Sequence, residues 1–121
     1  MKKIAHKSFF LLIPTRDRLE HLKNLLLDFS PFAPYISNCV IVDQSENFIG
    51  KDFEYVNYNF PITILKGDRN KGVNHSRNLA LKHYNNEDWI FCLDDDLRVA
   101  KEELDKIPQA LIDLNVDVLV F

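Results

Sequence analysis

At 121 residues the chain is long enough for one domain with a hydrophobic core of its own and too short for two. Hydrophobic residues make up 46% of the sequence and charged residues 27%, the proportions of an ordinary globular protein, which exclude a disordered chain. The net charge of -3 argues against a general nucleic-acid-binding surface, because such a surface needs a basic face.

The cysteines and the N-terminus bear on the cellular compartment. Cys39 and Cys92 both lie in apolar runs, so we expect two core thiols, no disulfide framework and a reducing compartment. Residues 1–7 are basic like the start of a signal peptide, but the apolar run 9–13 is too short and no cleavage site of small residues follows. No stretch is long enough to span a bilayer. We therefore expect a cytoplasmic protein, either free or at the inner face of the membrane.

The first half of the chain predicts two strands with a helix between them. Residues 8–13 form a run that is wholly apolar after Ser8, which predicts a buried strand that Pro14 ends, since proline lacks a backbone N–H. Leucines at helical spacing predict a helix over 19–29, and the apolar run 39–42 predicts a second buried strand that stops at Asp43. Both predicted strands are followed by polar residues.

The middle of the chain contains a candidate anion site. Residues 53–60 alternate aromatic and polar side chains, which leaves an edge strand and an extended loop both open, whereas 62–65 predict a strand. The loop over 66–72, with two glycines and three cations, leads into a helix predicted over 73–84. Free N–H groups and the helix dipole at such a helix start both favour phosphate, although a solvated connection is the simpler alternative.

The apolar run 89–93 stops abruptly at three consecutive carboxylates, Asp94, Asp95 and Asp96. The run predicts a core strand covered on both faces, as in parallel sheets. Two unit charges about 4 Å apart repel by roughly 4 kcal/mol at an effective dielectric constant near 20. Solvent, partial protonation or a hard divalent cation such as Mg²⁺ or Mn²⁺ would offset that repulsion, and a helix N-terminus decorated with acids is the plain alternative.

Strands alternating with helices predict an α/β fold with a mostly parallel sheet flanked by helices. A helix is expected over 101–115, bent or divided at Pro108, and a last strand over 116–121. Thr15, Arg16, Asp43 and the three acids would gather at the carboxyl edge of the sheet, where ligands bind in such folds. Acids for a metal and cations for phosphates together suit a nucleotide diphosphate.

Four segments at these strand ends resemble family 2 glycosyltransferases of the GT-A fold. They are residues 13–18 (IPTRDR), 40–45 (VIVDQS), 70–78 (NKGVNHSRN) and 91–96 (FCLDDD), in the order that the family has them. The resemblance implies the Rossmann-like half of a GT-A domain. It also implies transfer of a sugar from a nucleotide diphosphate, with UDP the commonest, to a hydroxyl of a glycan or lipid-linked acceptor, in polysaccharide or glycoconjugate synthesis.

The resemblance also implies roles for particular residues. Asp94 and Asp96 match the first and last positions of the DxD motif and would hold Mn²⁺ or Mg²⁺. Gln44 stands where the family often has a second acid, so an amide that can donate and accept replaces the usual carboxylate. The nucleotide-sugar-binding residues implied in this way are Pro14, Thr15, Arg16, Asp43, Gln44, Asn70, Gly72, Asn74, Arg77, Asp94 and Asp95.

Catalysis itself is expected to need more than this chain. In inverting members of the family, the base that deprotonates the acceptor comes from a later part of the domain, which here would lie beyond residue 121. We therefore expect residues 1–121 to form a single nucleotide-sugar-binding domain that turns over poorly or not at all, and an unpaired strand edge would allow self-association into homo-oligomers. A non-catalytic nucleotide-sugar-binding fragment and a Mg²⁺-dependent, flavodoxin-like phosphotransfer domain are the alternatives.

Overall fold

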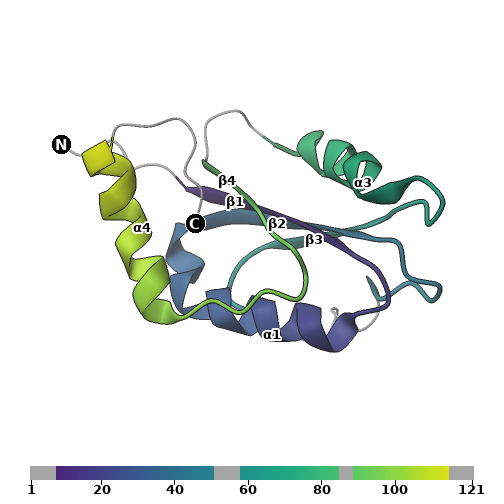
Figure 1. The fold of residues 1–121 in the computed structure, drawn as a ribbon, viewed down its shortest axis with the longest axis horizontal. Coiled ribbons are helices and arrows are strands. Elements are labelled where there is room, and N and C mark those ends of the chain that lie inside the picture. Colours follow the sequence, from purple (N-terminus) through teal and green to yellow (C-terminus); the bar gives the residue numbers. More distant parts are fainter. Residues whose placement is uncertain (1–7, 51–57, 85–88, 115–121) are drawn as a thin grey trace.

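The computed structural model describes residues 8–50, 58–84 and 89–114 and is built around a four-stranded sheet (Figure 1). The strands are β1 (Phe9–Thr15), β2 (Ile36–Asp43), β3 (Ile62–Lys66) and β4 (Trp89–Cys92), in the spatial order β3-β2-β1-β4. Each pair of neighbours is parallel. The predicted α/β fold with a mostly parallel sheet is therefore confirmed, and the carboxyl ends of all four strands lie at one edge.

β1 continues one residue past Pro14 instead of ending at it or before it, which corrects the predicted boundary. Successive residues of a strand direct their N–H and C=O groups to alternate neighbours. The carbonyl of Leu12 accepts the N–H of Leu93 on the β4 side, so Pro14, two residues on, faces that side too. Because β4 ends at Cys92, opposite Leu12, the N–H that proline lacks would have no strand partner there.

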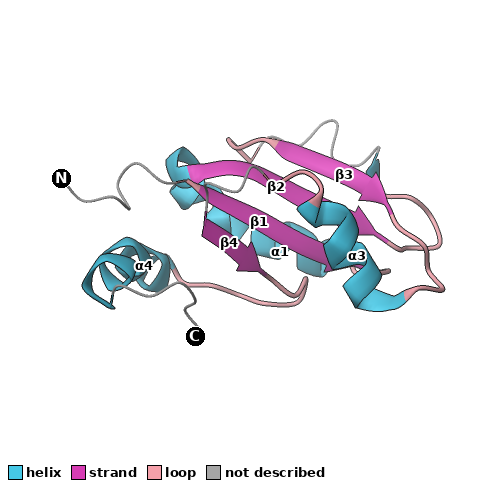
Figure 2. Ribbon diagram, turned by 90° about the horizontal axis from the view of Figure 1, so that it is seen from above, coloured by secondary structure: helices cyan, strands magenta, loops and turns pink. Residues whose placement is uncertain are grey.

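Helices cover both faces of the sheet, as the two ribbon views show (Figures 1 and 2). α1 (Leu19–Phe29) lies on one face and continues into a 3₁₀ helix, η2 (Ser30–Tyr35). α3 (Gly72–Leu81) lies on the other face and ends three residues before the boundary that the sequence predicted. The predicted apolar stripe of α1 is confirmed, since its buried side chains are Leu22, Leu25, Leu26 and Phe29.

The two faces of the sheet have separate hydrophobic cores. On β1, Phe9, Leu11 and Ile13 belong to the larger core under α1, whereas Phe10 and Leu12 belong to the smaller core under α3. Side chains of a strand alternate between the two faces, so a strand covered on both sides must be apolar at every position. This explains why the sequence of β1 shows no alternation.

β4 is less buried than the sequence predicted. Phe91 is buried, Trp89 and Ile90 are half-buried and Cys92 is exposed, which corrects the expectation of a fully covered strand with a core thiol. The reason is that β4 pairs with β1 alone among the described residues. Cys39, in the interior strand β2, is buried as expected, and burial raises the pKa of its thiol.

The chain after β4 leads to α4 (Lys101–Leu114), which runs undivided through Pro108. Leu104 and Ile107 of α4 join the core under α1. Residues 58–60 are not part of a strand, whereas residues 53–57 and the last strand predicted over 116–121 lie outside the described residues. Within the described part of the chain, no helix is long and apolar enough to cross a bilayer.

Asp28 of α1 anchors the segment between β4 and α4. Its carboxylate accepts hydrogen bonds from Arg98 Nε at 2.8 Å and Nη2 at 3.0 Å, and a third from the N–H of Val99 at 2.9 Å. The hydrogen bonds from Arg98 and then from Val99 lower the pKa of Asp28. This charged contact fixes the path of the chain directly after the three acids.

We expect Asp28→Asn to lower the free energy of unfolding at pH 7 by about 1 kcal/mol, because it removes the charge from a bidentate hydrogen-bonded pair with one exposed partner. The folded-state pKa lies below the unfolded value, so this stabilisation is complete above the unfolded pKa of about 3.9 and is lost as the pH falls through the folded pKa. Urea denaturation from pH 7 to pH 2.5 would measure it. Glu20→Gln, an exposed acid on the same helix, is the control, and an Asp28→Asn protein with the wild-type pH profile would contradict the prediction.

Candidate functional site

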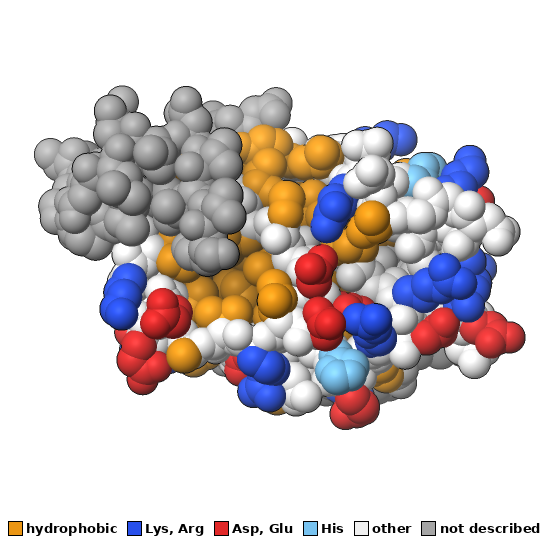
Figure 3. All heavy atoms as spheres, in the orientation of Figure 1, with side chains coloured by type: hydrophobic (Ala, Val, Ile, Leu, Met, Phe, Trp, Pro, Cys, Tyr) orange, Lys and Arg blue, Asp and Glu red, His pale blue; other side chains and the backbone are white. Residues whose placement is uncertain are grey.

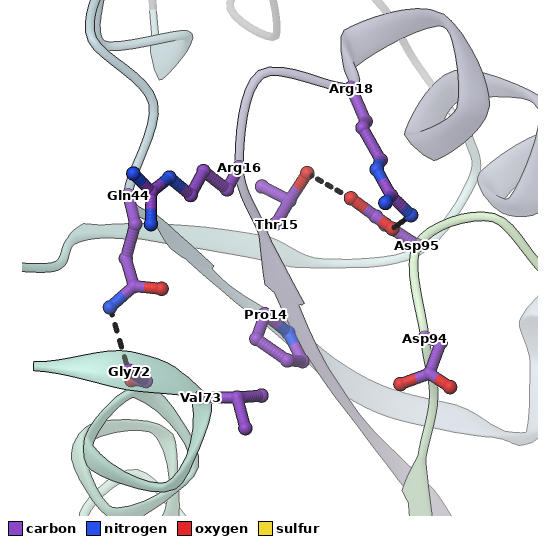
Figure 4. A pocket seen from close by; sticks show the side chains of 9 residues that line it. All are labelled: Pro14, Thr15, Arg16, Arg18, Gln44, Gly72, Val73, Asp94 and Asp95. Carbon is purple, nitrogen blue, oxygen red and sulfur yellow. Dashed lines mark hydrogen bonds and ion pairs between the residues drawn. The ribbon is translucent and has the colours of Figure 1, made fainter. Parts of the chain in front are cut away.

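The carboxyl ends of β1 and β2, the segment after β4 and the start of α3 enclose a cavity (Figure 4). Its volume of about 320 Å³ lies at the lower end of the range for small-molecule sites. The residues that line it come from four separate parts of the chain: Pro14, Thr15, Arg16, Arg18, Gln44, Gly72, Val73, Asp94 and Asp95. The sheet edge predicted from the sequence is therefore where the structure has a cavity.

The acidic loop (Asp94, Asp95 and Asp96) continues the alternation of β4. Phe91, Leu93 and Asp95 are buried, whereas Cys92, Asp94 and Asp96 are exposed. The middle carboxylate thus points inward, and Thr15 Oγ1 donates a hydrogen bond to its Oδ2 at 2.8 Å. Arg18 Nη1 lies 3.4 Å from the other oxygen. Asp95 therefore joins the end of β1 to the end of β4.

The two outer acids point to the solvent and are paired with arginines. Arg77 Nη2 of α3 lies 3.6 Å from Asp94 Oδ1, and Arg18 Nη1 lies 3.2 Å from Asp96 Oδ2. The repulsion expected among three adjacent carboxylates is thus offset in this structure by two guanidinium groups. Each outer acid leaves one oxygen outside these ion pairs, and Asp94 also lines the cavity.

The outer acids suit one kind of metal site. No group of three or more His, Cys, Asp or Glu side chains in the described part of the chain could hold a metal by itself. Mg²⁺ and Mn²⁺, however, are often bound through one or two carboxylates together with substrate phosphates. The chemistry of Asp94 and Asp96 therefore fits a cation shared with a diphosphate and does not fit a metal cage made of protein alone.

Gln44 forms the opposite wall of the cavity, directly after β2. Its Nε2 donates to the carbonyl oxygen of Asp68 at 2.6 Å and to that of Gly72 at 3.1 Å. Gly72 has a φ of 76°, a left-handed conformation that glycine adopts without strain. The Gln44 side chain therefore ties the end of β2 to the turn that opens α3.

A polar network beside the cavity joins three loops. Arg69 Nη1 donates to Asp17 Oδ2 and to the Gln44 carbonyl oxygen, both at 3.0 Å, and Arg16 Nη1 donates to the Arg69 carbonyl at 3.4 Å. The other oxygen of Asp17 accepts the N–H of Glu46 at 3.0 Å. This N–H and the Arg69 side chain lower the pKa of Asp17. Asp17 has a φ of 54°, so the network holds the β1–α1 turn in a conformation that is rare for aspartate.

Seven of the residues implied by the resemblance line the cavity: Pro14, Thr15, Arg16, Gln44, Gly72, Asp94 and Asp95. Asp43 is 1% exposed, and its two oxygens accept the N–H groups of Ser45 and Ile49, both at 2.9 Å. Asn70 and Asn74 are exposed on the loop before α3 and on its first turn, outside the lining. Asp96 and Arg77 also lie outside the lining, but each is paired with a charged residue of the site.

No individual role was predicted from the sequence for Arg18, Arg69 or Val73. The structure adds Arg18 and Val73 to the cavity lining and Arg69 to the network that holds the surrounding loops together. Arg18 and Val73 line the cavity, whereas Arg69 links two of the loops through its hydrogen bonds to Asp17 and to the Gln44 carbonyl. Arg18 and Val73 lie inside the segments that carry the resemblance; Val73 is directly beside residues that were given roles, and Arg18 is two residues from Arg16. Their position near a strand end or a helix start was the feature of the sequence that could have identified them as site residues.

A second cavity, of about 260 Å³, lies beside β4 on the side of α1 and α4. Its wall is mostly apolar and includes Phe29, Phe91, Leu93 and Leu104, with Arg98 and Glu103 at its rim. Figure 3 shows hydrophobic side chains gathered on this face of the molecule, next to acidic and basic ones. The acidic loop thus separates a polar cavity from an apolar one.

Comparisons with known proteins agree with this geometry. The sequence model of the family described as "Glycosyl transferase family 2" matches residues 11–121. An uncharacterized glycosyltransferase of Haemophilus influenzae is 25% identical over 103 residues, which cover 84% of this chain and 33% of that protein. The chain therefore belongs to glycosyl transferase family 2, and it spans about a third of the length of this curated relative.

Solved structures show the same fold. S. aureus TarS, residues 1–349, in complex with UDP superposes with a TM-score of 0.72 at 20% sequence identity, over 88% of this chain and 32% of that one. A second structure of the same TarS fragment gives a TM-score of 0.65, also at 20% identity. At this level of identity the likeness concerns the fold, and it confirms the expected GT-A architecture.

Proposed function

We propose that this chain binds a nucleotide-diphosphate sugar, together with a divalent cation, as the sugar-donor site of a family 2 glycosyltransferase. The observation that carries the proposal is the cavity at the strand ends, which has the outward carboxylate of Asp94 at one end and the hydrogen-bonding side chain of Gln44 at the other. TarS, which shares the fold of this chain, has been crystallised with UDP, so UDP is the first nucleotide to test.

In this proposal the acidic loop binds the diphosphate through a metal ion, and the arginines bind it directly. Asp94 and Asp96 would hold Mn²⁺ or Mg²⁺, and a cation bound there supplies Lewis-acid stabilisation of the leaving diphosphate. Arg77 and Arg18 lie beside the same carboxylates, so each can exchange an ion pair with aspartate for one with phosphate. Asp95 has a positioning role instead, because its carboxylate accepts hydrogen bonds from Thr15 and Arg18 and holds both side chains in place.

Asn70 and Asn74 are proposed to contact the sugar donor from the exposed side of the α3 turn, as the resemblance implies, and Pro14 and Thr15 from the end of β1. The acceptor is proposed to be a glycan or lipid-linked hydroxyl, and the reaction to take place in the cytoplasm or at the inner face of the membrane. The base that activates the acceptor is not assigned to any of these residues. Donor binding is thus the activity to test first.

The phosphotransfer alternative loses support from the position of Asp43. A phosphoacceptor aspartate must present a carboxylate oxygen to its substrate, but both oxygens of Asp43 accept backbone N–H groups and the residue is 1% exposed. A non-catalytic nucleotide-sugar-binding role uses the same cavity and predicts the same binding. Measurements of sugar transfer, rather than of binding, would separate that role from an enzyme.

We expect calorimetry to detect UDP binding that is strengthened at least tenfold by Mn²⁺, because the cation would bridge the outer carboxylates and the phosphates. UMP, which lacks the second phosphate, should gain much less from the metal. Titrations of UDP, UMP and a panel of UDP-sugars, each with and without Mn²⁺, would measure this. A folded protein that binds neither UDP nor any other nucleoside diphosphate would refute the proposed function.

A further inference from the structure

The orientation of the Gln44 amide is fixed by its two partners. Carbonyl oxygens only accept hydrogen bonds, so the group that lies 2.6 Å from the Asp68 oxygen and 3.1 Å from the Gly72 oxygen must be the NH₂ group. The reversed amide would place an oxygen against two oxygens. Both N–H groups of Gln44 are therefore used, and Oε1 accepts no hydrogen bond from the described part of the chain.

The surroundings of Gln44 prevent a change of rotamer. The residue is 6% exposed. A Cβ atom at Gly67 would lie 2.8 Å from Gln44 Cγ and 2.9 Å from Val42 Cγ1, so the glycine lets the loop pack directly on the Gln44 stem. The N–H of Gly67 also donates to the carbonyl of Asp43 at 2.8 Å. Gln44 thus presents a single group to the cavity, its Oε1, which Figure 4 shows on the side facing Pro14.

The two ends of the cavity carry different groups, a carboxylate at the Asp94 end and an amide beside the Arg16 side chain at the Gln44 end (Figure 4), and this orients a nucleotide within it. This step rests on the proposed function. A metal-bound diphosphate belongs at the end formed by Asp94, so the base must extend toward Gln44. Pro14 and Val73 give that end apolar surface for a planar ring, and Gln44 Oε1 gives it a hydrogen-bond acceptor (Figure 4).

We propose that Gln44 selects the base of the sugar donor by presenting only an acceptor to its hydrogen-bonding edge. Uracil has an N–H at N3 and can donate to Oε1, whereas cytosine has a lone pair at N3 and would meet it with repulsion. An ionised acidic residue at this position would likewise only accept a hydrogen bond from the base, because a carboxylate has no donor. Here the fixed orientation of the amide leaves only its acceptor facing the base. The chain should therefore use uridine rather than cytidine diphosphate sugars.

The test compares nucleotides that differ at this one position, using the full chain with Mn²⁺ and calorimetry. We expect UDP to bind at least tenfold more tightly than CDP, and also than 3-methyl-UDP, in which a methyl group replaces the N3 hydrogen. A loss of about one hydrogen bond with an unpaired polar group left behind corresponds to such a factor. Among purines, GDP, which has an N–H at N1, should bind more tightly than ADP, which does not.

Gln44→Leu should remove the preference, so that UDP and CDP bind alike, whereas Asn47→Ala, which deletes an exposed amide in the same loop, should keep it. The comparison of UDP with 3-methyl-UDP needs no variant and stays decisive if Gln44→Leu does not fold. Equal affinities for UDP, CDP and 3-methyl-UDP in the wild type would overturn the selection by Gln44 and leave nucleotide binding intact. Failure of all nucleoside diphosphates to bind would overturn both.

Discussion

Asp94→Asn is expected to weaken the Mn²⁺-dependent binding of UDP by about 100-fold or more, since even residues that only support a metal ligand typically contribute 10-fold to 100-fold. Asp94 is exposed, borders the cavity and is paired with Arg77 at 3.6 Å, so the substitution removes a proposed metal ligand without opening the core. Folding stability should stay close to that of the wild type, because an exposed ion pair contributes at most about 1 kcal/mol.

The variant should also show a feature that damage to the fold would not produce. Without the Asp94 charge, Arg77 is free to pair with a phosphate, so UDP binding in the absence of metal should be unchanged or slightly stronger. Calorimetry with and without Mn²⁺ measures both affinities, and the electron paramagnetic resonance signal of free Mn²⁺ measures metal uptake independently. Asp105→Asn makes the same charge change on α4, where Asp105 is paired with Lys101, and should alter neither. Full retention of the Mn²⁺ effect in Asp94→Asn would exclude Asp94 as a ligand.

The sequence was sufficient to predict the sheet edge at which the candidate site lies, because its strong signals lie at strand ends. Apolar runs that stop at Pro14, Asp43 and Asp94 mark three strands, and a parallel sheet brings their ends to the same edge. The boundaries were less accurate, since they depend on neighbours. β1 extends past Pro14 because Thr15 still pairs with Asp43 of β2, and proline is tolerated there because β4 ends opposite Leu12. The register of two strands far apart in the chain cannot be read from either one.

The sequence could have predicted which of the three acidic side chains points into the protein and which point to the solvent. Residues 91–96 alternate between buried and exposed, so a strand period extended through the acidic loop assigns Asp95 to the interior and Asp94 and Asp96 to the surface. The motif alone treats the middle acid as variable and does not reveal that it supports Thr15. Periodicity therefore adds information that the motif lacks.

The cationic partners of the site could not be found in this way. Arg18 reaches Asp95 and Asp96 across 77 and 78 positions of sequence, and Arg69 reaches Asp17 across 52. No spacing rule links residues so far apart, and arginine on a loop usually indicates only solvent exposure. Such pairs follow from the packing of one loop on another, which no local pattern in the sequence encodes.

Asp43→Ala is expected to lower the free energy of unfolding by about 3 kcal/mol, the other large effect in this protein. Asp43 is 1% exposed and its carboxylate accepts the N–H groups of Ser45 and Ile49, each at 2.9 Å. Its removal leaves both groups without these acceptors, and an unsatisfied buried polar group costs about 1–3 kcal/mol. Urea denaturation followed by circular dichroism would measure the loss, with Glu46→Ala, which removes an exposed acid from the same loop, as the control.

The same substitution tests which role Asp43 has, because the resemblance implies a nucleotide contact whereas its observed hydrogen bonds organise the loop that carries Gln44. If the role is structural, Asp43→Ala should weaken UDP binding and reduce the preference for UDP over CDP together, since the Gln44 amide would no longer be held in one orientation. A stable Asp43→Ala protein that binds UDP and CDP more weakly by the same factor would instead indicate direct contact with a part that both nucleotides share, such as the ribose. The ratio of the UDP and CDP affinities therefore distinguishes a residue that contacts the shared part of the nucleotide from one that positions Gln44 to select the base.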